Sequence, residues 1–264
     1  MQQSVDVARE IEAAATRFAE QGWAVVQDLL PGGLVADLAE ALDALCARAP
    51  QLPAAVRARS FVFEKDLPAK ARDGVPAAEV GDAVFIASDL AAHSPVWRVL
   101  LDQPALGALA RAVLGSDAAC LHFMNGTIKQ PHWGRAIAWH RDFPNHYLCP
   151  SRSSFVRLML CLDGMQAEGG ATRFIPGSHR IGDDTARQAK GEGGIGPSEA
   201  RPAPGDGVAA TCAPGAIVLI HPKVLHGGPV NRGGRIRRNV VLQAGVPDDP
   251  PMGLPESVTG WLLA

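Results

Sequence analysis

Apolar residues in the first part of the chain recur at helical spacing. Between Val7 and Phe18 they return about every 3.6 residues, and Gly22 follows, a residue type that readily adopts the left-handed conformation that ends a helix. Leucines from Leu34 to Leu45 form a second stripe of this kind before Pro50. The pattern therefore predicts two amphipathic helices near the N-terminus.

Local signals predict three further elements in this region. The apolar stretch from Trp23 to Leu30 predicts a strand. Ser94-Pro95 and Gln103-Pro104 each predict the start of a helix, because proline lacks the N–H that the first helical turn leaves unpaired. Helices therefore dominate the structure expected for residues 1–118.

From about residue 119 the pattern changes to short apolar segments separated by Gly and Pro. They predict strands at Leu121 to Lys129, Ser153 to Leu162, Ala171 to Ile175, Ala216 to Ile220 and Ile236 to Ala244. The connections show no pattern of long crossover helices, which favours an antiparallel sandwich or jelly roll over a parallel α/β sheet. The expected fold is mainly β with flanking helices, in which an N-terminal helical layer covers a jelly roll.

We expect a single domain over residues 1–264, because no charge run, flexible tether or internal repeat divides the chain. Within it, residues 1–118 form the helix-rich support, 119–246 the jelly-roll core and 247–264 a C-terminal tail. Residues 182–207 are rich in Gly, Pro and charge, and they carry too few large apolar side chains to form core. We expect this insert to be a mobile lid.

Composition and charge narrow the classes of partner. The chain has 25 basic and 27 acidic residues, a net charge of −2, and only 5% aromatic residues, so it offers no basic face for a nucleic acid. No apolar run reaches the roughly 18 residues of a spanning helix, and the first residues lack a signal-peptide pattern. We expect a cytoplasmic protein, a monomer or homodimer, that acts on a small molecule without nucleic-acid or membrane partners.

The cysteines are odd in number, widely scattered and never spaced as C-x-x-C. This argues against a disulfide framework and against a thiolate zinc site. We expect all five to be reduced thiols: Cys46, Cys120, Cys149, Cys161 and Cys212.

Candidate metal ligands lie in the predicted β region. Residues two apart in an extended segment point to the same side, so His140 and Asp142 can present an imidazole and a carboxylate to one point. His226 offers a second imidazole from a distant strand. Two His and one carboxylate on one face of an octahedron leave three positions open, which suits non-haem Fe(II) that activates oxygen.

Spacing alone does not choose the second histidine. His221 lies five residues before His226, and each is followed eleven residues later by an arginine, Arg232 and Arg237 respectively. Context favours His226, because Arg237 lies within the last predicted strand whereas Arg232 lies among turn residues.

In that last strand, alternation places Arg237 on one face with Asn239, Val241 and Gln243. Arg238 faces the other way. Arg235 is the alternative to Arg237.

The chain resembles the phytanoyl-CoA dioxygenase family of Fe(II)- and 2-oxoglutarate-dependent oxygenases, which also contains ectoine hydroxylases. The residues that carry the resemblance are F-A-E-Q-G-W at 18–23, W-H-R-D at 139–142, P-G-S-H at 176–179, H-G-G at 226–228, and Arg237. They span most of the chain. Their combination in this order is far more specific than any single motif.

The resemblance implies a double-stranded β-helix, a cupin-like jelly roll, with iron held by His140, Asp142 and His226. It also implies that Arg237 binds the distal carboxylate of 2-oxoglutarate. This role suits a guanidinium, which matches a carboxylate bidentately and stays charged when buried.

The family's strand before the H-x-D motif often carries polar groups for the cosubstrate. Thr127 is the first candidate here and Asn125 the second. Asp142 occupies the position at which halogenating members carry Gly or Ala, so the resemblance favours hydroxylation over halogenation.

Further residues are candidates for contact with the substrate, and each has a plainer interpretation. Trp139 and Phe143 can equally be ordinary apolar packing, and Arg157 can be a solvated side chain on a strand. His179 is better explained as a structural residue that holds the turn before it. The full candidate set is Trp139, Phe143, Asn145, His146, Arg157 and Thr172.

The expected activity is hydroxylation of an unactivated C–H bond in an amino-acid derivative, acyl compound or secondary metabolite. Fe(II), 2-oxoglutarate and O2 are the expected cofactor and cosubstrates, succinate and CO2 the coproducts, and ascorbate a candidate reductant. Two other classes remain open. One is a cupin-like isomerase or hydrolase in which the triad binds zinc and activates water, and the other is a non-catalytic ligand-binding jelly roll.

Overall fold

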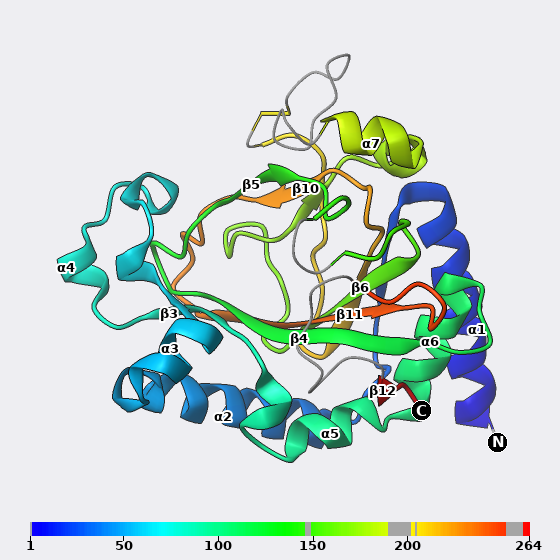
Figure 1. Ribbon diagram of the computed structural model, residues 1–264, viewed down its shortest axis with the longest axis horizontal. Coiled ribbons are helices and arrows are strands. Elements are labelled where there is room, and N and C mark those ends of the chain that lie inside the picture. Colours follow the sequence, from blue (N-terminus) through cyan, green and yellow to red (C-terminus); the bar gives the residue numbers. More distant parts are fainter. Residues whose placement is uncertain (1, 146–148, 190–201, 204, 252–260) are drawn as a thin grey trace.

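Two antiparallel sheets face each other, and helices cover the outer face of the larger one (Figure 1). The structure is a computed structural model that describes residues 2–145, 149–189, 202, 203, 205–251 and 261–264. The sheets are separate in their hydrogen bonding and do not close into one barrel.

The larger sheet has eight strands. In spatial order they are β1 (Trp23–Val26), β9 (Ala216–Ile220), β6 (Phe155–Cys161), β11 (Arg237–Gly245), β4 (Cys120–Lys129), β3 (Val84–Ala87) and β2 (Phe61–Phe63), with β12 (Trp261–Leu262) also paired to β4. The central pair aligns Arg237 with Lys129, Asn239 with Thr127 and Val241 with Asn125. Because directly paired residues share a face, the side chains of these six residues lie on the same side of the sheet.

The smaller sheet has four short strands, in the order β5 (Ile137–His140), β10 (His226–Gly228), β7 (Arg173–Phe174) and β8 (Val208–Ala209). His226 lies opposite His140 on one side and Phe174 on the other. A Cβ on Gly227 would lie 2.9 Å from the Ile137 carbonyl oxygen, so only glycine lets β10 approach β5 this closely. This register places the two histidines side by side.

The helices pack mainly on the far side of the larger sheet, as Figure 1 shows for α2, α5 and α6. A Cβ on Gly126 of β4 would lie 2.7 Å from the Leu42 side chain, which shows how closely α2 meets the sheet. The helices are α1 (Gln2–Gln21), α2 (Gly32–Arg48), α3 (Ala54–Ser60), α4 (Ala77–Val80), α5 (Val96–Leu101), α6 (Pro104–Leu114) and α7 (Asp183–Ala189). Single 3-10 turns occur at Ala49–Gln51, Glu64–Asp66, Ala69–Arg72, Leu90–Ala92 and Ser178–Arg180.

Alternation along the strands divides the interior into two cores. In β6, Leu158 and Leu160 join the large core between the sheet and the helices. Met159 and Cys161 point the other way, into a smaller core that also contains Phe174 of the second sheet. The period of two expected for half-buried strands therefore separates the structural face of the larger sheet from the face that looks toward the smaller one.

These elements confirm a mainly β fold with flanking helices. The leucine stripe of the second predicted helix is buried in α2. Gly22 has a φ of +81° and follows the last residue of α1, and α6 begins at Pro104. Several predicted strands are longer than those observed, because β1 ends at Val26 and β7 contains only two residues.

The structure adds three details to the expected segments. The support region also contains β2 and β3, which extend the larger sheet, and the C-terminal tail returns as β12. The insert expected at 182–207 begins with α7, whose Ala186 packs against Phe143 and Phe155. The role of this insert as a mobile lid stays a prediction. Residues 190–201 and 204 of the insert lie outside the described residues.

In the part of the chain that the structure describes, no helix combines the length and apolar character needed to cross a membrane.

Candidate active site

His140, Asp142 and His226 converge on one point between the sheets. A possible ligand atom from each lies within 4.8 Å of the others. Nε2 of His140 is 3.6 Å from Oδ1 of Asp142, and Nε2 of His226 is 3.7 Å from Oδ2. The two imidazole rings are 4.2 Å apart between centroids. Such a group can hold a divalent metal ion.

Local backbone structure orients each member of this triad. His140 ends β5, and the chain stays extended so that Asp142 points to the same side. Arg141 between them points elsewhere and donates from Nε to the Lys223 carbonyl oxygen at 2.8 Å. The next residue, Phe143, donates its amide N–H to the Pro222 carbonyl oxygen at 2.8 Å, which fixes the chain after the carboxylate.

Both imidazoles are held in a form suited to metal binding. Nδ1 of His140 lies 2.8 Å from the Ala138 carbonyl oxygen, and Nδ1 of His226 lies 3.0 Å from that of Val224. A carbonyl oxygen can only accept, so each Nδ1 carries a hydrogen, and Nε2 is the nitrogen of each ring that faces Asp142. Burial, followed by the neighbouring His140, lowers the pKa of His226 to about 4, so this ring is neutral at physiological pH.

Asp142 is fully ionised despite its burial. Burial raises the pKa of its carboxyl, but Arg157 and then the imidazoles of His226 and His140 outweigh that effect and hold the pKa well below its usual value. Nη1 of Arg157 on β6 forms an ion pair with Oδ1 of Asp142 at 2.7 Å. Oδ2 of Asp142 is buried and has no hydrogen-bond partner among the described residues, which leaves one carboxylate oxygen available to a cation.

A cavity of about 430 Å³ lies beside the triad, a volume typical of small-molecule sites. Both sheets contribute to it. Its lining includes His140, His226 and Gly227 from the smaller sheet, Arg157, Met159, Ile220, Phe123, Asn125, Thr127, Arg237, Asn239 and Val241 from the larger one, and Val62, Phe85, Ile86, Ser88, Ile137 and Thr172.

Arg237 supplies positive charge to this cavity. Only 4% of its surface is exposed, and it forms no ion pair with any carboxylate in the described part of the chain. Nη1 donates to the Gly170 carbonyl oxygen and approaches Sδ of Met165 at 3.8 Å. Nε of Arg237 has no hydrogen-bond partner among the described residues. Burial lowers the pKa of Arg237 to about 10, so the guanidinium remains charged. A buried cation of this kind is suited to binding a carboxylate.

Lys129 lies beside Arg237 and shares an acceptor with it. It is fully buried, and its Nζ donates to the carbonyl oxygens of Pro229 at 2.5 Å and Gly170 at 3.3 Å. Burial lowers its pKa well below the usual value, and the neighbouring Arg237 adds to this effect. Gly170 itself has a φ of +69°, and its carbonyl oxygen accepts hydrogen bonds from both side chains.

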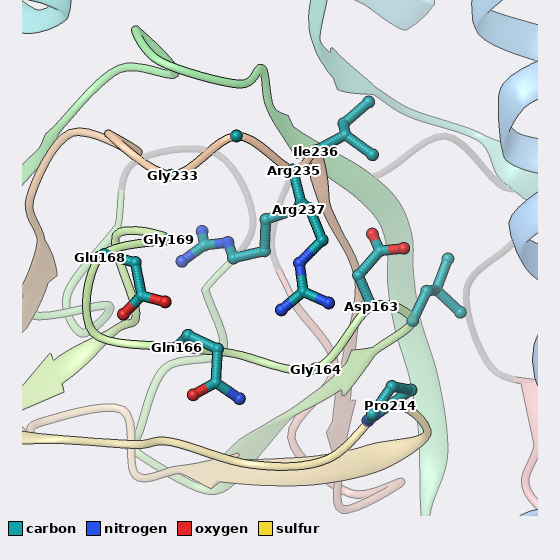
Figure 2. Close-up of a pocket in the computed structure, with 12 residues that line it drawn as sticks. Asp163, Gly164, Gln166, Glu168, Gly169, Pro214, Gly233, Arg235, Ile236 and Arg237 are labelled. Carbon is teal, nitrogen blue, oxygen red and sulfur yellow. The ribbon is translucent and has the colours of Figure 1, made fainter.

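Arg237 also borders a second cavity of about 460 Å³. Figure 2 shows Arg235 and Arg237 projecting into this space, with Asp163, Gln166 and Glu168 around it. Arg235 is exposed and lines only the second cavity. The structure therefore separates the two arginines that the sequence left as alternatives, since Arg237 alone borders the cavity beside the triad.

The two cosubstrate candidates on β4 lie on the face that looks into the triad cavity. Thr127 and Asn125 both line it. They lie on β4 opposite Asn239 and Val241, the next two residues of β11 on the same face as Arg237. Oδ1 of Asn125 is buried without a hydrogen-bond partner among the described residues. Both positions therefore lie in the same cavity as Arg237.

The residues proposed as substrate contacts separate into two groups. Arg157 and Thr172 line the cavity. Phe143 instead packs with Cys149 and Phe155 in a separate buried cluster, and Nε1 of Trp139 donates to the Ala203 carbonyl oxygen at 3.0 Å. Neither of these two residues is among the cavity's lining residues.

The remaining two substrate candidates add nothing to the described cavity. Asn145 is half-buried and does not line it. His146 lies outside the described residues.

His221 and His179 lie away from the triad. Their rings are 4.9 Å apart, His221 also approaches Phe18 at 5.6 Å, and Nε2 of His179 lies 3.1 Å from the Ala19 carbonyl oxygen. These contacts join the turn before β10 to α1. His226, not His221, is the histidine that the fold brings to Asp142.

The sequence analysis missed one wall of the cavity. Phe85, Ile86 and Ser88, in and after β3, line it together with Val62. The signal was the short run of apolar residues at 84–87, which contains too few residues to show a period. The pairing of Arg157 with Asp142 was also missed, because nothing local links these two positions.

A family model described as phytanoyl-CoA dioxygenase matches residues 18–239. The match includes all three members of the triad as well as Arg237, and it covers most of the chain. No curated protein matches the chain in sequence.

Solved structures share the fold at low sequence identity. EctD from S. alaskensis, crystallised with 2-oxoglutarate and 5-hydroxyectoine, is 24% identical, with 96% of this chain and 82% of that chain covered and a TM-score of 0.66. The epimerase SnoN from nogalamycin biosynthesis, in complex with Fe3+, alpha ketoglutarate and nogalamycin RO, is 18% identical, with 97% and 100% covered and a TM-score of 0.67. The carbocyclase SnoK from the same biosynthesis is 16% identical, with 96% of each chain covered and a TM-score of 0.67.

These likenesses establish the fold, and the family match extends from α1 to the strand that carries Arg237. The chain belongs to the phytanoyl-CoA dioxygenase family of Fe(II)- and 2-oxoglutarate-dependent oxygenases.

Proposed function

We propose that this protein hydroxylates an unactivated C–H bond of a small molecule and converts 2-oxoglutarate to succinate and CO2. One observation carries the proposal. The same cavity of about 430 Å³ is bordered by His140 and His226 of a possible metal-binding triad and by Arg237, a buried arginine that forms no ion pair in the described residues. This arrangement offers one place for a metal ion and another for a carboxylate within a single small-molecule site.

In this proposal, Fe(II) is held by Nε2 of His140, Nε2 of His226 and the carboxylate of Asp142. The donor set fits, since both Nδ1 atoms are held by backbone carbonyl oxygens, both Nε2 atoms face Asp142, and Oδ2 of Asp142 is buried without a hydrogen bond among the described residues. When bound, the ion supplies oxygen activation at its open positions. Arg157 is the positioning residue that holds the Asp142 carboxylate through Oδ1 and leaves Oδ2 free for the metal.

Arg237 is proposed to bind the distal carboxylate of 2-oxoglutarate. Its buried guanidinium provides the charge, and Thr127 and Asn125 provide polar groups on the adjacent strand of the same face. A carboxylate in this position would neutralise a cation that burial destabilises. Asp142 occupies the position of the third protein ligand, which favours hydroxylation over halogenation.

The rest of the cavity is proposed to receive the substrate. Ile220 of β9 and Phe85 and Ile86 of β3 give apolar surface on the two sides of the cavity, while Arg157 and Thr172 offer polar contacts. A small molecule with an apolar portion and a few polar groups fits this lining. Closing such a site around the substrate excludes water from the reacting C–H bond.

The proposal is tested with the full chain, Fe(II), ascorbate and 2-oxoglutarate in air. Succinate is measured alone and with a panel of amino-acid derivatives, acyl compounds and secondary metabolites. We expect slow succinate formation that a productive substrate accelerates, and 18O from O2 in the hydroxylated product. Product without inserted oxygen would redirect the proposal to epimerisation or ring closure, the chemistries named for SnoN and SnoK.

Metal binding is measured independently of turnover. Titration of the chelator-treated protein with Fe(II) should show one site that His226→Gln abolishes. His221→Gln is the matched control, because His221 is a half-buried histidine five positions away that lies outside the triad. No Fe(II) binding and no succinate would overturn the proposal. Turnover with zinc and without 2-oxoglutarate would favour a hydrolase or isomerase, and binding without any turnover would favour a ligand-binding protein.

A further inference from the structure

Arg157 presents a second guanidinium to the cavity beside the triad. It lies on β6 directly opposite Gln243 of β11, the strand that also carries Arg237. At about 3.3 Å per residue along β11, the backbones of Gln243 and Arg237 are roughly 20 Å apart on one face of the sheet. Both arginines line the cavity. The cavity therefore has two cationic groups that come from well-separated positions on the larger sheet.

Neighbouring side chains fix the guanidinium of Arg157 and leave part of it uncovered. Nη1 forms the ion pair with Oδ1 of Asp142 at 2.7 Å, and Cζ lies 5.4 Å from the centre of the Phe123 ring, which also lines the cavity. Nε lies 3.5 Å from Oε1 of Gln243. Nη2 has no hydrogen-bond partner among the described residues, and 18% of the side chain is exposed. Arg157 therefore keeps donors in a fixed place for a further acceptor.

The balance of charge around the cavity also favours an anion. Among the described residues that line it, none is acidic, and Asp142 is the carboxylate that pairs with Arg157. In the proposed complex, two guanidinium groups and a divalent ion are opposed by Asp142 and by the two carboxylates of 2-oxoglutarate, and the imidazole ligands are neutral. One positive charge remains, and Lys129 adds to this excess whenever it is protonated. A buried charge is costly unless it is paired, so the site favours one negative charge on the substrate.

We propose that the substrate of this enzyme carries a single carboxylate and that Nη2 of Arg157 donates to it. The inference rests on the proposed function and narrows its substrate class. A guanidinium stays charged when buried and forms strong hydrogen bonds to a carboxylate. A phosphate ester, with a charge of about −1.5 to −2, would exceed the single charge that the site balances. Because Phe123, Phe85 and Ile220 give apolar surface to the same cavity, the class is a small monocarboxylic acid with an apolar body.

The experiment is calorimetric titration of the full chain loaded with Fe(II) and N-oxalylglycine in the absence of oxygen. N-oxalylglycine is an analogue of 2-oxoglutarate that is not turned over, so it occupies the place of the cosubstrate. The probes are matched pairs of an acid and its neutral amide: hexanoate with hexanamide, and phenylacetate with phenylacetamide. We expect the acid to bind about tenfold or more tightly than its amide, the effect of one hydrogen bond to a charged group.

Variants at two positions separate recognition of charge from general polarity. Arg157→Gln should reduce the preference for the acid to within about twofold. Arg157→Lys keeps a positive charge and should retain part of the preference. Thr172→Val is the matched control, because it removes a neutral polar group from the lining of the same cavity, and it should leave the preference unchanged. The comparison of acids with amides in the wild type does not depend on the folding of any variant.

Equal affinity within each pair, or no binding of either acid below about 10 mM, would overturn the proposal. A preference for the acid that survives in Arg157→Gln would also overturn it. If this variant instead binds N-oxalylglycine more weakly and keeps the preference for the acid, the guanidinium serves the cosubstrate and not the substrate.

Failure of this inference is distinguishable from failure of the proposed function. The proposed function is tested by Fe(II) binding and by slow succinate formation, and neither measurement requires a substrate. If the wild type binds Fe(II) and forms succinate but does not prefer the acids, only the assignment of a carboxylate substrate to Arg157 falls.

Discussion

Replacing Arg237 with methionine separates the binding role of this residue from any structural one. The guanidinium is buried and forms no ion pair in the described part of the chain, so its charge is costly when the cavity holds no anion. Methionine keeps most of the volume and removes the charge. The free energy of unfolding without ligands should therefore change by less than about 1 kcal/mol or rise, as is common when buried charges are replaced by apolar groups.

The same substitution should severely weaken 2-oxoglutarate binding. Truncating one partner of a buried, hydrogen-bonded charge pair costs about 2–5 kcal/mol. This range corresponds to roughly a thirtyfold to several-thousandfold rise in the 2-oxoglutarate concentration needed for half-maximal succinate formation. Because the triad is unchanged, Fe(II) should bind to the variant as it does to the wild type.

The assay is succinate formation against 2-oxoglutarate concentration, paired with urea unfolding of the ligand-free protein. Arg238→Met is the matched control, because Arg238 lies on the opposite face of β11 and pairs with Asp163 at 2.6 Å and Asp43 at 2.5 Å. It should reduce stability and leave the 2-oxoglutarate requirement unchanged. An unaltered requirement in Arg237→Met would refute the assignment of the anchor. A large loss of ligand-free stability would refute the argument that its buried charge is uncompensated.

Three further substitutions test other parts of the structure. Asp142→Ala should abolish Fe(II) binding in calorimetry while the circular dichroism spectrum is preserved, and full activity would remove this residue from the site. Burial lowers the pKa of His122 to about 4 from an ordinary value of 6.5, so the unfolded chain binds more protons between these pH values. The contribution of His122 to the free energy of unfolding is therefore fully present above about pH 6.5, and it falls toward pH 4 by about 1.4 kcal/mol per pH unit. His122→Gln should make the free energy of urea unfolding less dependent on pH between these values. Parallel pH profiles for the variant and the wild type would contradict this reasoning. Asp249→Asn should cost about 1.5–3 kcal/mol in urea unfolding, because this carboxylate accepts hydrogen bonds from Ser151 and Ser154, and an unchanged midpoint would show those bonds to be dispensable.

Local periodicity explains what the sequence predicted well. The alternation in the last strand placed Arg237, Asn239 and Val241 on one face, and all three line the cavity. The H-x-D spacing placed His140 and Asp142 on one side of an extended segment, and the structure brings His226 to the same point. Each inference needed only a run of several residues in a single strand.

Contacts between strands that are distant in the sequence could not be predicted from local patterns. Asp142 follows β5 of the smaller sheet and Arg157 lies on β6 of the larger one, yet their side chains are 2.7 Å apart. Arg157 by itself has the pattern of a solvated residue on a strand. The role proposed for Arg157 depends on how the two sheets face each other. Period-two alternation within either strand gives no information about that arrangement.

The same limit applies to the short strands. β7 and β10 contain two and three residues, which is too few to show alternation. Their pairing nevertheless fixes His226 between His140 and Phe174. β2 and β3 were missed for the same reason, and with them one wall of the cavity.

The unsatisfied polar atoms of the site link its function to its stability. Ten buried side-chain polar atoms in the described residues lack a hydrogen-bond partner, and four of them belong to Asn125, Asp142, Arg237 and Asn239. A buried polar atom without a partner costs about 1–3 kcal/mol, so their concentration here makes the empty site a local source of instability. A metal at Asp142 and a carboxylate at Arg237 would each satisfy such an atom only in the folded state. Binding of either ligand should therefore raise the melting temperature, and the increase should grow with the logarithm of the ligand concentration relative to its Kd.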